Sequence, residues 1–343
     1  MRKLSGGVKI AAIYGSVFLG AGFASGQELL RYFVGFGRLG LLGIIIAGIL
    51  FALTGWAVLR ICRREQIASY HQLMGYLFGI KLGRAIEGAV VLFLFSLFVA
   101  MLAGAGATGR EAFNMPFSVG TVAVGISVFL VLCFGLKGIV KVNIILAPFM
   151  LLGGIIVGLF TFFAYSHPVF SMVYGRAFGL AWLLSAFIYA AYNLVTGVPV
   201  LAATAEMAET KRDAKIGGLL GGGIITVLGL CMVLPLFLYH VNIVNLEIPF
   251  LYIVTQHGNG FRLFYLTVLI AAIMTTAACN AFAVTEWLKG QGIVGNVKIA
   301  AGLCVIGVAV SYIGFSNIVV FVYPVFGLLG LFKIIVILWR GFR

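Results

Sequence analysis

Residues 14–28 read YGSVFLGAGFASGQE and lie within a long apolar run at residues 8–34. Glycine weakens a helix because it loses more conformational freedom on folding than any other residue, and this stretch has glycines at positions 15, 20, 22 and 26. Unwound backbone in a bilayer is costly unless protein, water or a ligand pairs its N–H and C=O groups. We therefore expect a broken membrane helix that lines a polar cavity. The alternative is that Gly22 and Gly26 form a small-xxx-small face for close helix packing.

The composition is that of a membrane protein. Of the 343 residues, 63% are hydrophobic and 9% are charged, whereas soluble domains carry about 25% charged residues. A membrane-spanning helix needs about 20 apolar residues. The predicted spans are residues 8–34, 39–60, 85–108, 118–136, 141–164, 178–205, 216–239, 262–287, 294–313 and 317–339. The connections at 62–84 and 240–261 are longer and amphipathic, and we expect both to lie along the membrane surface.

The distribution of basic residues agrees with ten spans. If the N-terminus lies in the cytoplasm, 18 Lys and Arg residues fall on the cytoplasmic side and 5 on the other. The cytoplasmic set includes Lys333, Arg340 and Arg343 near the end of the last span. Because cytoplasmic loops carry an excess of Lys and Arg, we predict a multi-pass protein of the cell inner membrane with both termini in the cytoplasm.

A second interruption, at residues 193–199, follows the first by about half the chain length. Pro199 removes a helix donor there, and paired interruptions in two halves are the best sequence pointer to a transporter site. A duplicated half with five spans must enter the membrane the other way up. We therefore predict an all-α polytopic membrane protein of ten transmembrane helices, formed by two inverted five-helix repeats (residues 1–164 and 165–343) with broken first and sixth helices. The alternative for the sixth span is an ordinary proline kink, with Thr196 bonded back along its own helix.

Glu28 is a carboxylate within the first apolar run. Charged side chains at membrane depth are expensive and mark functional sites by default. We expect Glu28 to carry a proton or to bind a cationic group. The alternatives are a structural ion pair with Arg31 or simple exposure near the outer surface.

Two other places offer groups for a coupling ion. Thr275 and Thr276 in the eighth span carry adjacent hydroxyl groups, which together with carbonyls of a broken helix can bind a small hard cation. Such threonines are also common as packing residues that bond to their own backbone. Lys141 begins the fifth span, where its ammonium could stand in place of a sodium ion. The alternative for Lys141 is an interfacial lysine that snorkels to the headgroups.

The sequence argues against several other classes of protein. The net charge of +14 suggests nucleic acid, but the basic residues stand singly between apolar runs, so we expect no nucleic-acid partner. Walker A, HExxH and GxSxG motifs are absent, so we expect neither ATP-driven transport nor an enzyme. The five cysteines form no CxxC pair and are interpreted as small buried side chains.

The five-plus-five arrangement, the Gly20-Ala21-Gly22 break and the second break in the sixth span resemble the amino acid–polyamine–organocation superfamily. Its members have the leucine-transporter type fold, and the stretch Gly20 to Glu28 looks most like a bacterial branch of it. The resemblance implies a substrate site at the two breaks, flanked by the third and eighth spans. The implied substrate-binding residues are Gly20, Ala21, Gly22, Phe23, Ala24, Ser25, Gly26, Gln27, Glu28, Ser96, Tyr192, Asn193, Thr196, Gly197 and Thr276.

The same resemblance implies where a coupling ion would bind. In sodium-coupled relatives the ion lies between the first and eighth spans, which here means backbone near Gly20 and Phe23 with Thr275 and Thr276. In proton-coupled relatives a fifth-span lysine can take that place, and Lys141 is the matching residue. Glu28 is not a general feature of the superfamily, so it points to selection of a cationic group or to proton transfer.

The function that these observations favour is secondary active transport of a small polar organic solute, an amino acid or a related amine, by ion-coupled alternating access. The expected partners are the substrate and the lipid bilayer. No cofactor is expected beyond a coupling Na⁺ or H⁺. A ligand receptor of the same fold that does not transport, and a passive channel, remain alternatives, and the oligomeric state stays open.

Overall fold

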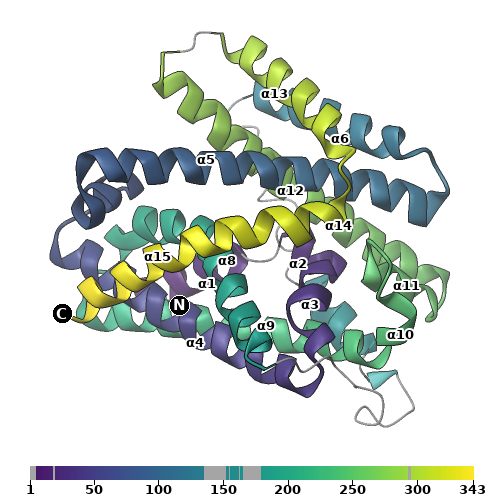
Figure 1. The fold of residues 1–343 in the computed structure, drawn as a ribbon, viewed down its shortest axis with the longest axis horizontal. Helices are drawn as coiled ribbons and strands as arrows, with labels where there is room; N and C mark the ends of the chain where they lie inside the picture. The colour runs from purple at the N-terminus through teal and green to yellow at the C-terminus, as the bar shows by residue number, and fades with distance from the viewer. Residues whose placement is uncertain are drawn as a thin grey trace.

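The computed structural model describes residues 5–17, 20–134, 179–292 and 295–343, together with residues 152–164 except 154 and 162. In this part of the chain every regular element is a helix, and the longest of them run roughly side by side across the molecule (Figure 1). Lys141 lies outside the described residues. The boundary predicted between two repeats at residues 164 and 165 falls at the edge of an undescribed stretch, so the repeat stays a prediction.

The helices follow the predicted spans closely. They are α1 (Gly6–Val17), α2 (Ala21–Ser25), α3 (Gln27–Tyr32), η1 (Val34–Phe36), α4 (Arg38–Arg64), α5 (Tyr70–Phe113), α6 (Phe117–Cys133), α8 (Ala181–Thr204), η2 (Ala205–Met207), α9 (Lys211–Leu238), α10 (His240–Ile243), α11 (Pro249–Thr255), α12 (Asn259–Gly290), α13 (Asn296–Ser311), α14 (Phe315–Asn317), the π-helical turn η3 (Ile318–Val322) and α15 (Tyr323–Phe342). Only the predicted span at 141–164 lies largely outside the described residues, where residues 155–161 are helical.

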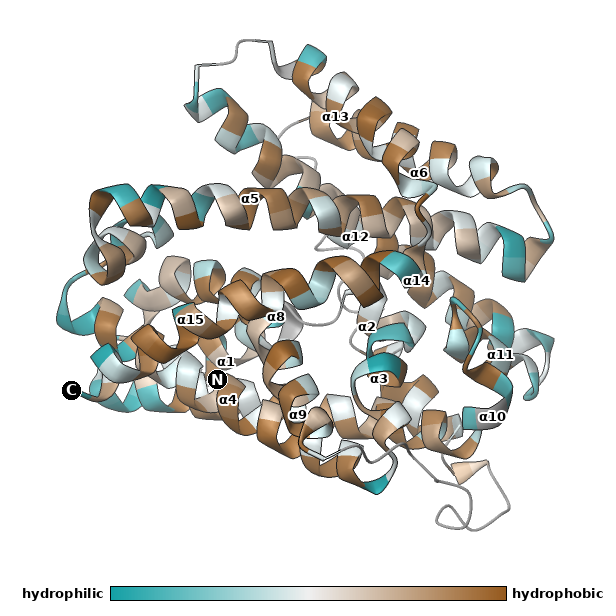
Figure 2. Ribbon diagram, in the orientation of Figure 1, coloured by the Kyte–Doolittle hydropathy of each residue, from teal (hydrophilic) through white to brown (hydrophobic). Residues whose placement is uncertain are grey.

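The long helices are apolar along most of their length. Six described helices are long and apolar enough to cross a membrane, and α6 and α13 are shorter apolar helices. Figure 2 shows hydrophobic residues along α4, α6, α13 and α15, with hydrophilic residues gathered mainly at helix ends and in connections. Many large apolar side chains face outward, among them Ile49, Val227 and Val305, which are 51%, 60% and 70% exposed. An outer surface of this kind requires lipid around it, so the chain is a multi-pass membrane protein.

The helices pack as two groups. In the first packing group, α9 lies against α1 and α4, and α8 lies against α4. In the second packing group, α5 lies against α6 and α12, and α13 lies against α6. Helix α15 packs chiefly against α8 and α4 of the first group. The short helix α2 contacts α12, so the interrupted first span lies where the two groups meet.

Glycines of α9 let the first packing group come together. A β-carbon at Gly218 or Gly222 would overlap the backbone of α4 at Trp56 or Ala52, and one at Gly221 would press on the Tyr14 ring of α1. Small residues four positions apart allow such close approach of helix backbones in lipid, where packing rather than the hydrophobic effect drives helix association. These glycines are therefore explained by the close approach of α9 to α4 and α1, and not by a need for a flexible backbone.

The two ends of the molecule are defined by contacts between helix termini. At one end, which we call the termini side, the N–H of Gly7 donates to Asp213 at the start of α9 (3.1 Å), and Trp56 near the end of α4 packs against Phe342 (ring centroids 5.0 Å apart). At the opposite side, Glu111 at the end of α5 contacts the segment before α11. Both ends of the chain therefore lie on the same side, as an even number of spans requires.

Protein covers the apolar faces of both long connections. Residues 70–78 form a first arm of α5 that ends at Gly79, whose φ of 77° interrupts the helix, and Leu73 and Leu77 of this arm are buried. In the other connection, α11 buries Phe250 and Leu251. The first arm of α5 and α11 lie at opposite ends of the molecule (Figure 1).

We predict that two neighbouring glycines of α9 respond differently to the same substitution. Gly222→Ala should lower the stability of the folded protein by about 1–3 kcal/mol, because the added methyl group overlaps Ala52. Gly223→Ala is the matched control, since nothing lies within 4 Å of its β-carbon position and alanine favours helix. Thermal unfolding of both variants in neutral detergent measures the difference. Equal midpoints would show that the α4–α9 contact is looser than described.

Candidate substrate site

The first span is interrupted twice. Helix α1 ends at Val17 and α2 begins at Ala21, with Gly20 extended between them (φ −74°, ψ 174°). The second interruption is at Gly26, whose φ of 81° separates α2 from α3. A β-carbon at Gly26 would also lie 2.6 Å from the Phe250 ring, so both the conformation and the close approach require glycine. The predicted break in the first helix is confirmed.

Side chains pair much of the backbone exposed by these interruptions. The Ser25 hydroxyl donates to the Gly22 carbonyl (3.0 Å) and accepts from the Gln27 N–H (3.2 Å), which bridges the turn at Gly26. The Tyr265 hydroxyl of α12 donates to the Ala24 carbonyl at 3.2 Å. Ser25 was predicted to bind substrate. In the structure both hydrogen bonds of its hydroxyl stabilise the turn at Gly26.

Glu28 folds back over the interrupted span. A β-carbon at Gly22 would overlap the Glu28 carboxylate, so only glycine leaves room for it. The other carboxylate oxygen accepts a hydrogen bond from the Tyr192 hydroxyl of α8 at 2.6 Å. Glu28 is 7% exposed, and no described Lys, Arg or His lies within 4.0 Å of its carboxylate. The alternative of an ion pair with Arg31 is not observed, because Arg31 donates to Ser316 instead (3.1 Å).

Aromatic rings surround the Glu28–Tyr192 pair. The Tyr192 ring centroid lies 5.3 Å from that of Tyr32, 4.9 Å from that of Tyr323 and 6.3 Å from that of Phe93. Tyr189, one turn earlier on α8, lies 5.5 Å from Tyr192. All are buried, and they come from α3, α5, α8 and α15. We call Tyr32, Phe93, Tyr189, Tyr192 and Tyr323 the aromatic cluster.

Two buried polar atoms, one on a residue of this cluster and one on the residue before Glu28, have no hydrogen-bond partner among the described residues. They are Oε1 of Gln27, whose amide nitrogen donates to Ser316 at 2.8 Å, and the hydroxyl of Tyr323. Buried polar groups in folded proteins are nearly always paired, so each exception calls for an explanation. No described protein group pairs either atom, so both are candidates for contact with a polar ligand.

The predicted break in the sixth helix is wrong. Helix α8 is continuous from Ala181 to Thr204, and Pro199 lies inside it. The Asn193 amide donates to the Tyr189 carbonyl (3.0 Å), and the Thr196 hydroxyl donates to the Asn193 carbonyl (2.8 Å). Gly197 is buried without a positive φ. A proline costs a buried helix one hydrogen bond, and neighbouring helices often compensate for it in membranes, so the alternative of a proline within a helix is the correct one.

The predicted sodium site has its elements side by side. A β-carbon at Gly20 would lie 3.3 Å from Oγ1 of Thr276, which places the break against α12. The carbonyls of Gly20 and Phe23 accept from Ala24 (2.9 Å) and Gly26 (3.1 Å), and Thr275 donates back to Ala271 and Ala272 of its own helix. Gly20 and Thr276 are thus neighbours, and the sodium site stays a prediction. Lys141 cannot be compared, as it lies outside the described residues.

Sequence reasoning missed most of the aromatic cluster. Of the predicted residues, the structure brings Glu28 and Tyr192 together at this cluster, whereas Gln27 bonds to Ser316. Ser96 was predicted on the third span, but its hydroxyl donates to the Leu92 carbonyl of its own helix (3.0 Å), and Phe93 is the α5 residue that packs on Tyr192. The spacing of Tyr189 and Tyr192 on one helical face was a usable signal. Tyr32 and Tyr323 gave none, because aromatic residues are common throughout the chain.

Helix α11 covers the interrupted span from the opposite side. Phe250 contacts Gly26, and the two N–H groups before α11, those of Glu247 and Ile248, donate to the Glu111 carboxylate at 3.1 and 3.3 Å. Glu111 therefore caps α11 from another helix.

Next to this contact, Arg110 forms an ion pair with Glu247, with 3.4 Å between nitrogen and oxygen. Burial raises the pKa of the Glu247 carboxyl above its usual range, and Arg110 partly offsets that rise. As the pH falls, Glu247 should therefore take up a proton, and the ion pair should weaken, at a higher pH than in an exposed pair.

Two curated relatives span nearly the whole chain. The uncharacterized membrane protein YkvI of Bacillus subtilis strain 168 is 29% identical over 331 residues, which cover 94% of this chain and 92% of YkvI. The uncharacterized protein YyaD of the same strain is 27% identical over 334 residues, which cover 95% and 94%. No family model matches the chain.

Several solved structures have a similar arrangement of helices. Mhp1 in its inward-facing conformation matches 98% of this chain with 76% of its own, at a TM-score of 0.60 and 16% identity. A manganese transporter of Eremococcus coleocola matches 96% with 78% of its own (TM-score 0.63, 16% identity). The chain has the leucine-transporter type fold. A Na⁺-coupled sialic acid symporter in its outward-open state also shares this fold, with a TM-score of 0.56 and 12% identity over 96% of this chain and 76% of its own. Identities this low establish the fold alone.

We predict that Gly22 and Glu28 are coupled in stability. Gly22→Ala should destabilise the protein by about 1–3 kcal/mol, because its methyl group overlaps the Glu28 carboxylate. In a Glu28→Ala background the same change should cost far less, since the space is then free. A double-mutant cycle of unfolding midpoints in neutral detergent measures the coupling. Additive effects would mean that Glu28 does not occupy this position.

We predict that Glu111→Ala loosens α11 without unfolding the protein. Losing a helix cap costs about 0.5–2 kcal/mol, which corresponds to roughly 2- to 30-fold faster local opening. Hydrogen exchange of the amides in residues 249–255, measured by mass spectrometry, reports this opening. Glu286→Ala, which removes an exposed carboxylate paired with Lys289, is the matched control and should leave these amides unchanged. Unchanged exchange in Glu111→Ala would remove Glu111 as the cap.

Proposed function

We propose that this protein is an ion-coupled secondary transporter of a small polar organic solute that carries an amine, such as an amino acid or a related amine. The substrate would bind at the interrupted first span, with its ammonium group on the Glu28 carboxylate and against the aromatic cluster. The observation that carries the proposal is a buried carboxylate with a tyrosine hydroxyl, and no described cationic side chain, within bonding distance.

The chemistry of the site favours an organic cation. Aromatic faces attract ammonium groups, by about 2 kcal/mol or more when water is excluded, and a carboxylate supplies the countercharge. The site is less suited to a divalent metal ion, because the described residues contain no cluster of three or more His, Cys, Asp or Glu side chains. The unpaired Gln27 Oε1 and Tyr323 hydroxyl add an acceptor and a donor for the polar remainder of such a solute.

Two sets of groups are available for the coupling ion. Sodium would bind between α2 and α12, at the carbonyls of Gly20 and Phe23 and the hydroxyls of Thr275 and Thr276, and the closeness of Gly20 to Thr276 supports this placement. A proton would be carried by Glu28. Because the sialic acid symporter that shares this fold is Na⁺-coupled, sodium is the first ion to test.

Transport in this proposal is a movement of one packing group against the other. Glu28 and Tyr192 belong to elements of the first group, and Phe93 and Thr276 belong to the second, so the site lies where a relative movement would open it. We place the protein in the cell inner membrane with both termini in the cytoplasm, on the strength of the excess of Lys and Arg on that side.

The experiment is charge movement on a solid-supported membrane with purified protein in liposomes. A panel of amino acids and amines is applied with and without sodium and at two pH values. The expected result is a transient current specific to amine-bearing solutes. Its dependence on sodium would select the α2–α12 site, and its dependence on pH alone would select Glu28.

We predict that Glu28→Gln abolishes the substrate-dependent current while the protein stays folded. The amide removes the negative charge but keeps the size of the side chain. Glu286→Gln, at an exposed ion pair on α12, is the matched control and should retain the current. Wild-type current in Glu28→Gln would reduce Glu28 to a structural role.

Two other outcomes would favour the alternative functions. Thermal stabilisation of the protein by a ligand, with no flux under any gradient, would favour a receptor. Turnover above about 10³ s⁻¹ would favour a channel.

A further inference from the structure

Helix α15 carries a buried lysine that the candidate site does not use. Lys333 is 3% exposed, although the charge distribution of the sequence suggested a topology signal at the cytoplasmic surface. Its amine donates to the Leu194 carbonyl of α8 at 3.4 Å and lies 5.6 Å from the centre of the Tyr70 ring. No described carboxylate lies within 4.0 Å of it; Glu87, on the neighbouring stretch of α5, is paired with His71.

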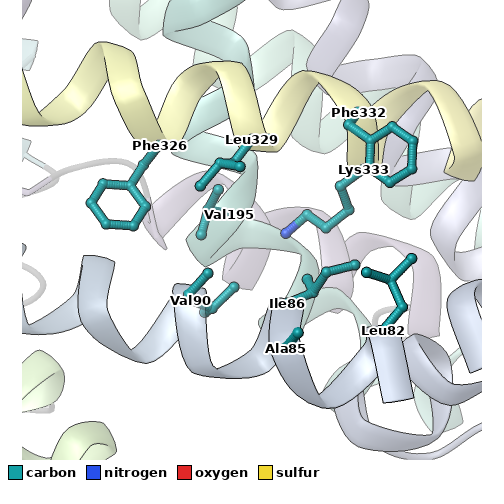
Figure 3. Close-up of a pocket in the computed structure, with 11 residues that line it drawn as sticks. Leu82, Ala85, Ile86, Val90, Val195, Phe326, Leu329, Phe332 and Lys333 are labelled. Atoms are coloured by element: carbon teal, nitrogen blue, oxygen red, sulfur yellow. The ribbon is translucent and has the colours of Figure 1, made fainter. Parts of the chain in front are cut away.

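Lys333 lines a cavity of about 260 Å³ between α5, α8 and α15. Figure 3 shows its side chain extending from α15 into the space between α15 and α5, with the nitrogen beside Val195. Every other lining residue is apolar, including Ile86 and Val90 of α5 and Phe326 of α15. The cavity is therefore apolar, with a single amine in its wall.

The mouth of this cavity faces the bilayer. Leu82, Leu329 and Phe332 line it and are 48%, 54% and 52% exposed. Half-exposed leucine and phenylalanine on long apolar helices lie against lipid in a membrane protein. A molecule dissolved in the bilayer can thus reach Lys333 from the side, without passing through the candidate substrate site.

The amine is poorly satisfied in its surroundings. A charged ammonium among apolar side chains is costly unless it is paired and hydrogen-bonded. Here it has one long contact to a carbonyl and one aromatic face. The Tyr70 hydroxyl is buried and has no partner among the described residues, but Tyr70 does not line the cavity. A carboxylate in the cavity would neutralise the ammonium.

We propose that this cavity binds a lipophilic monocarboxylate that enters from the bilayer, with its carboxylate on Lys333 and its apolar chain between α5 and α15. A single cation forms a neutral pair with a single negative charge. The volume lies just below the roughly 300 Å³ at which pockets for small molecules begin, so it suits one short chain or ring.

The depth of Lys333 argues against a phospholipid as the occupant. Lys333 lies seven residues before Arg340, which is about 10 Å along a helix that rises 1.5 Å per residue. At the end of α15, Arg340 and Arg343 each lie over the Trp339 ring, and such residues mark the level of the headgroups. A phospholipid phosphate would stay at that level, whereas a monocarboxylate can descend to Lys333 and be neutralised there.

An occupant of this cavity would lie close to the candidate substrate site. Phe326 lines the cavity and packs on Phe93 of the aromatic cluster, with ring centroids 4.8 Å apart. One layer of aromatic rings therefore separates the two. The proposed binding nevertheless stands apart from the transport function, because its test measures binding alone.

The test is binding of sodium decanoate to the purified protein in neutral detergent, followed by titration calorimetry and by the shift in unfolding temperature. The wild-type protein should bind decanoate and should bind neither decanol nor decyltrimethylammonium at the same site. Lys333→Met, which keeps the length of the side chain and removes the charge, should weaken binding about 10- to 100-fold, as expected for loss of a charge-assisted hydrogen bond. Lys298→Met, at an exposed lysine on α13, is the matched control and should bind normally.

A second variant tests the cavity itself while Lys333 is kept. Ala89→Phe fills the space between α5 and α15 and should also abolish decanoate binding, so the proposal stays testable if Lys333→Met fails to fold. Wild-type affinity for decanoate in Lys333→Met or in Ala89→Phe would overturn the proposal. Tighter binding of dioctanoyl phosphatidylglycerol than of decanoate, with the same dependence on Lys333, would overturn it in favour of a phospholipid site.

Discussion

The contact of the Glu28 carboxylate with the backbone at Gly22 determines the shape of the interrupted first span. Glu28 belongs to α3, and Gly22 belongs to α2, so the contact folds one short helix back over the other across the turn at Gly26. The hydrogen bond from Tyr192 then fixes the same carboxylate to α8. One side chain thereby ties three elements together, and it is a side chain whose charge is expensive at membrane depth. Stability and the proposed chemistry both depend on this one group.

The surroundings of Glu28 combine two kinds of contact that respond differently to movement. Hydrogen bonds such as Ser25 to Gly22 and Tyr265 to Ala24 are directional, and they keep the interruption itself in a fixed form. Ring contacts, such as Phe93 with Tyr192 and Tyr192 with Tyr323, tolerate sliding and tilting. The contacts of Phe93 with Tyr192 and Tyr323 cross between the two packing groups, whereas the four tyrosines of the cluster contact one another within the first group. The site is therefore rigid at its carboxylate and adaptable in its walls.

The fold was predictable because its strongest signals are local. Glycine spacing at residues 15–26 predicts the broken first helix, and span length with the distribution of Lys and Arg predicts the order of the helices. The continuity of α8 was not predictable, because it depends on how helices packed beside it accommodate Pro199. Glu28 was found from its charge alone. Lys333 carried the same kind of signal, but its place near a predicted span end concealed it. The aromatic cluster depends on contacts between residues far apart in the sequence, such as Phe93 and Tyr323.

The π-helical turn at Ile318–Val322 joins the two ends of the last membrane helix in a particular rotational phase. A π-turn holds one residue more than an α-helical turn. Ser316 before it contacts Gln27 and Arg31, whereas Tyr323 and Lys333 after it face α8. Closing this turn to a regular α-helix at the same chain length would shift everything beyond it by one residue, a rotation of about 100° relative to Ser316. Removal of one residue would instead close the turn and leave the helix beyond it in nearly its present phase, so a deletion between residues 316 and 323 should be tolerated better here than in a regular membrane helix.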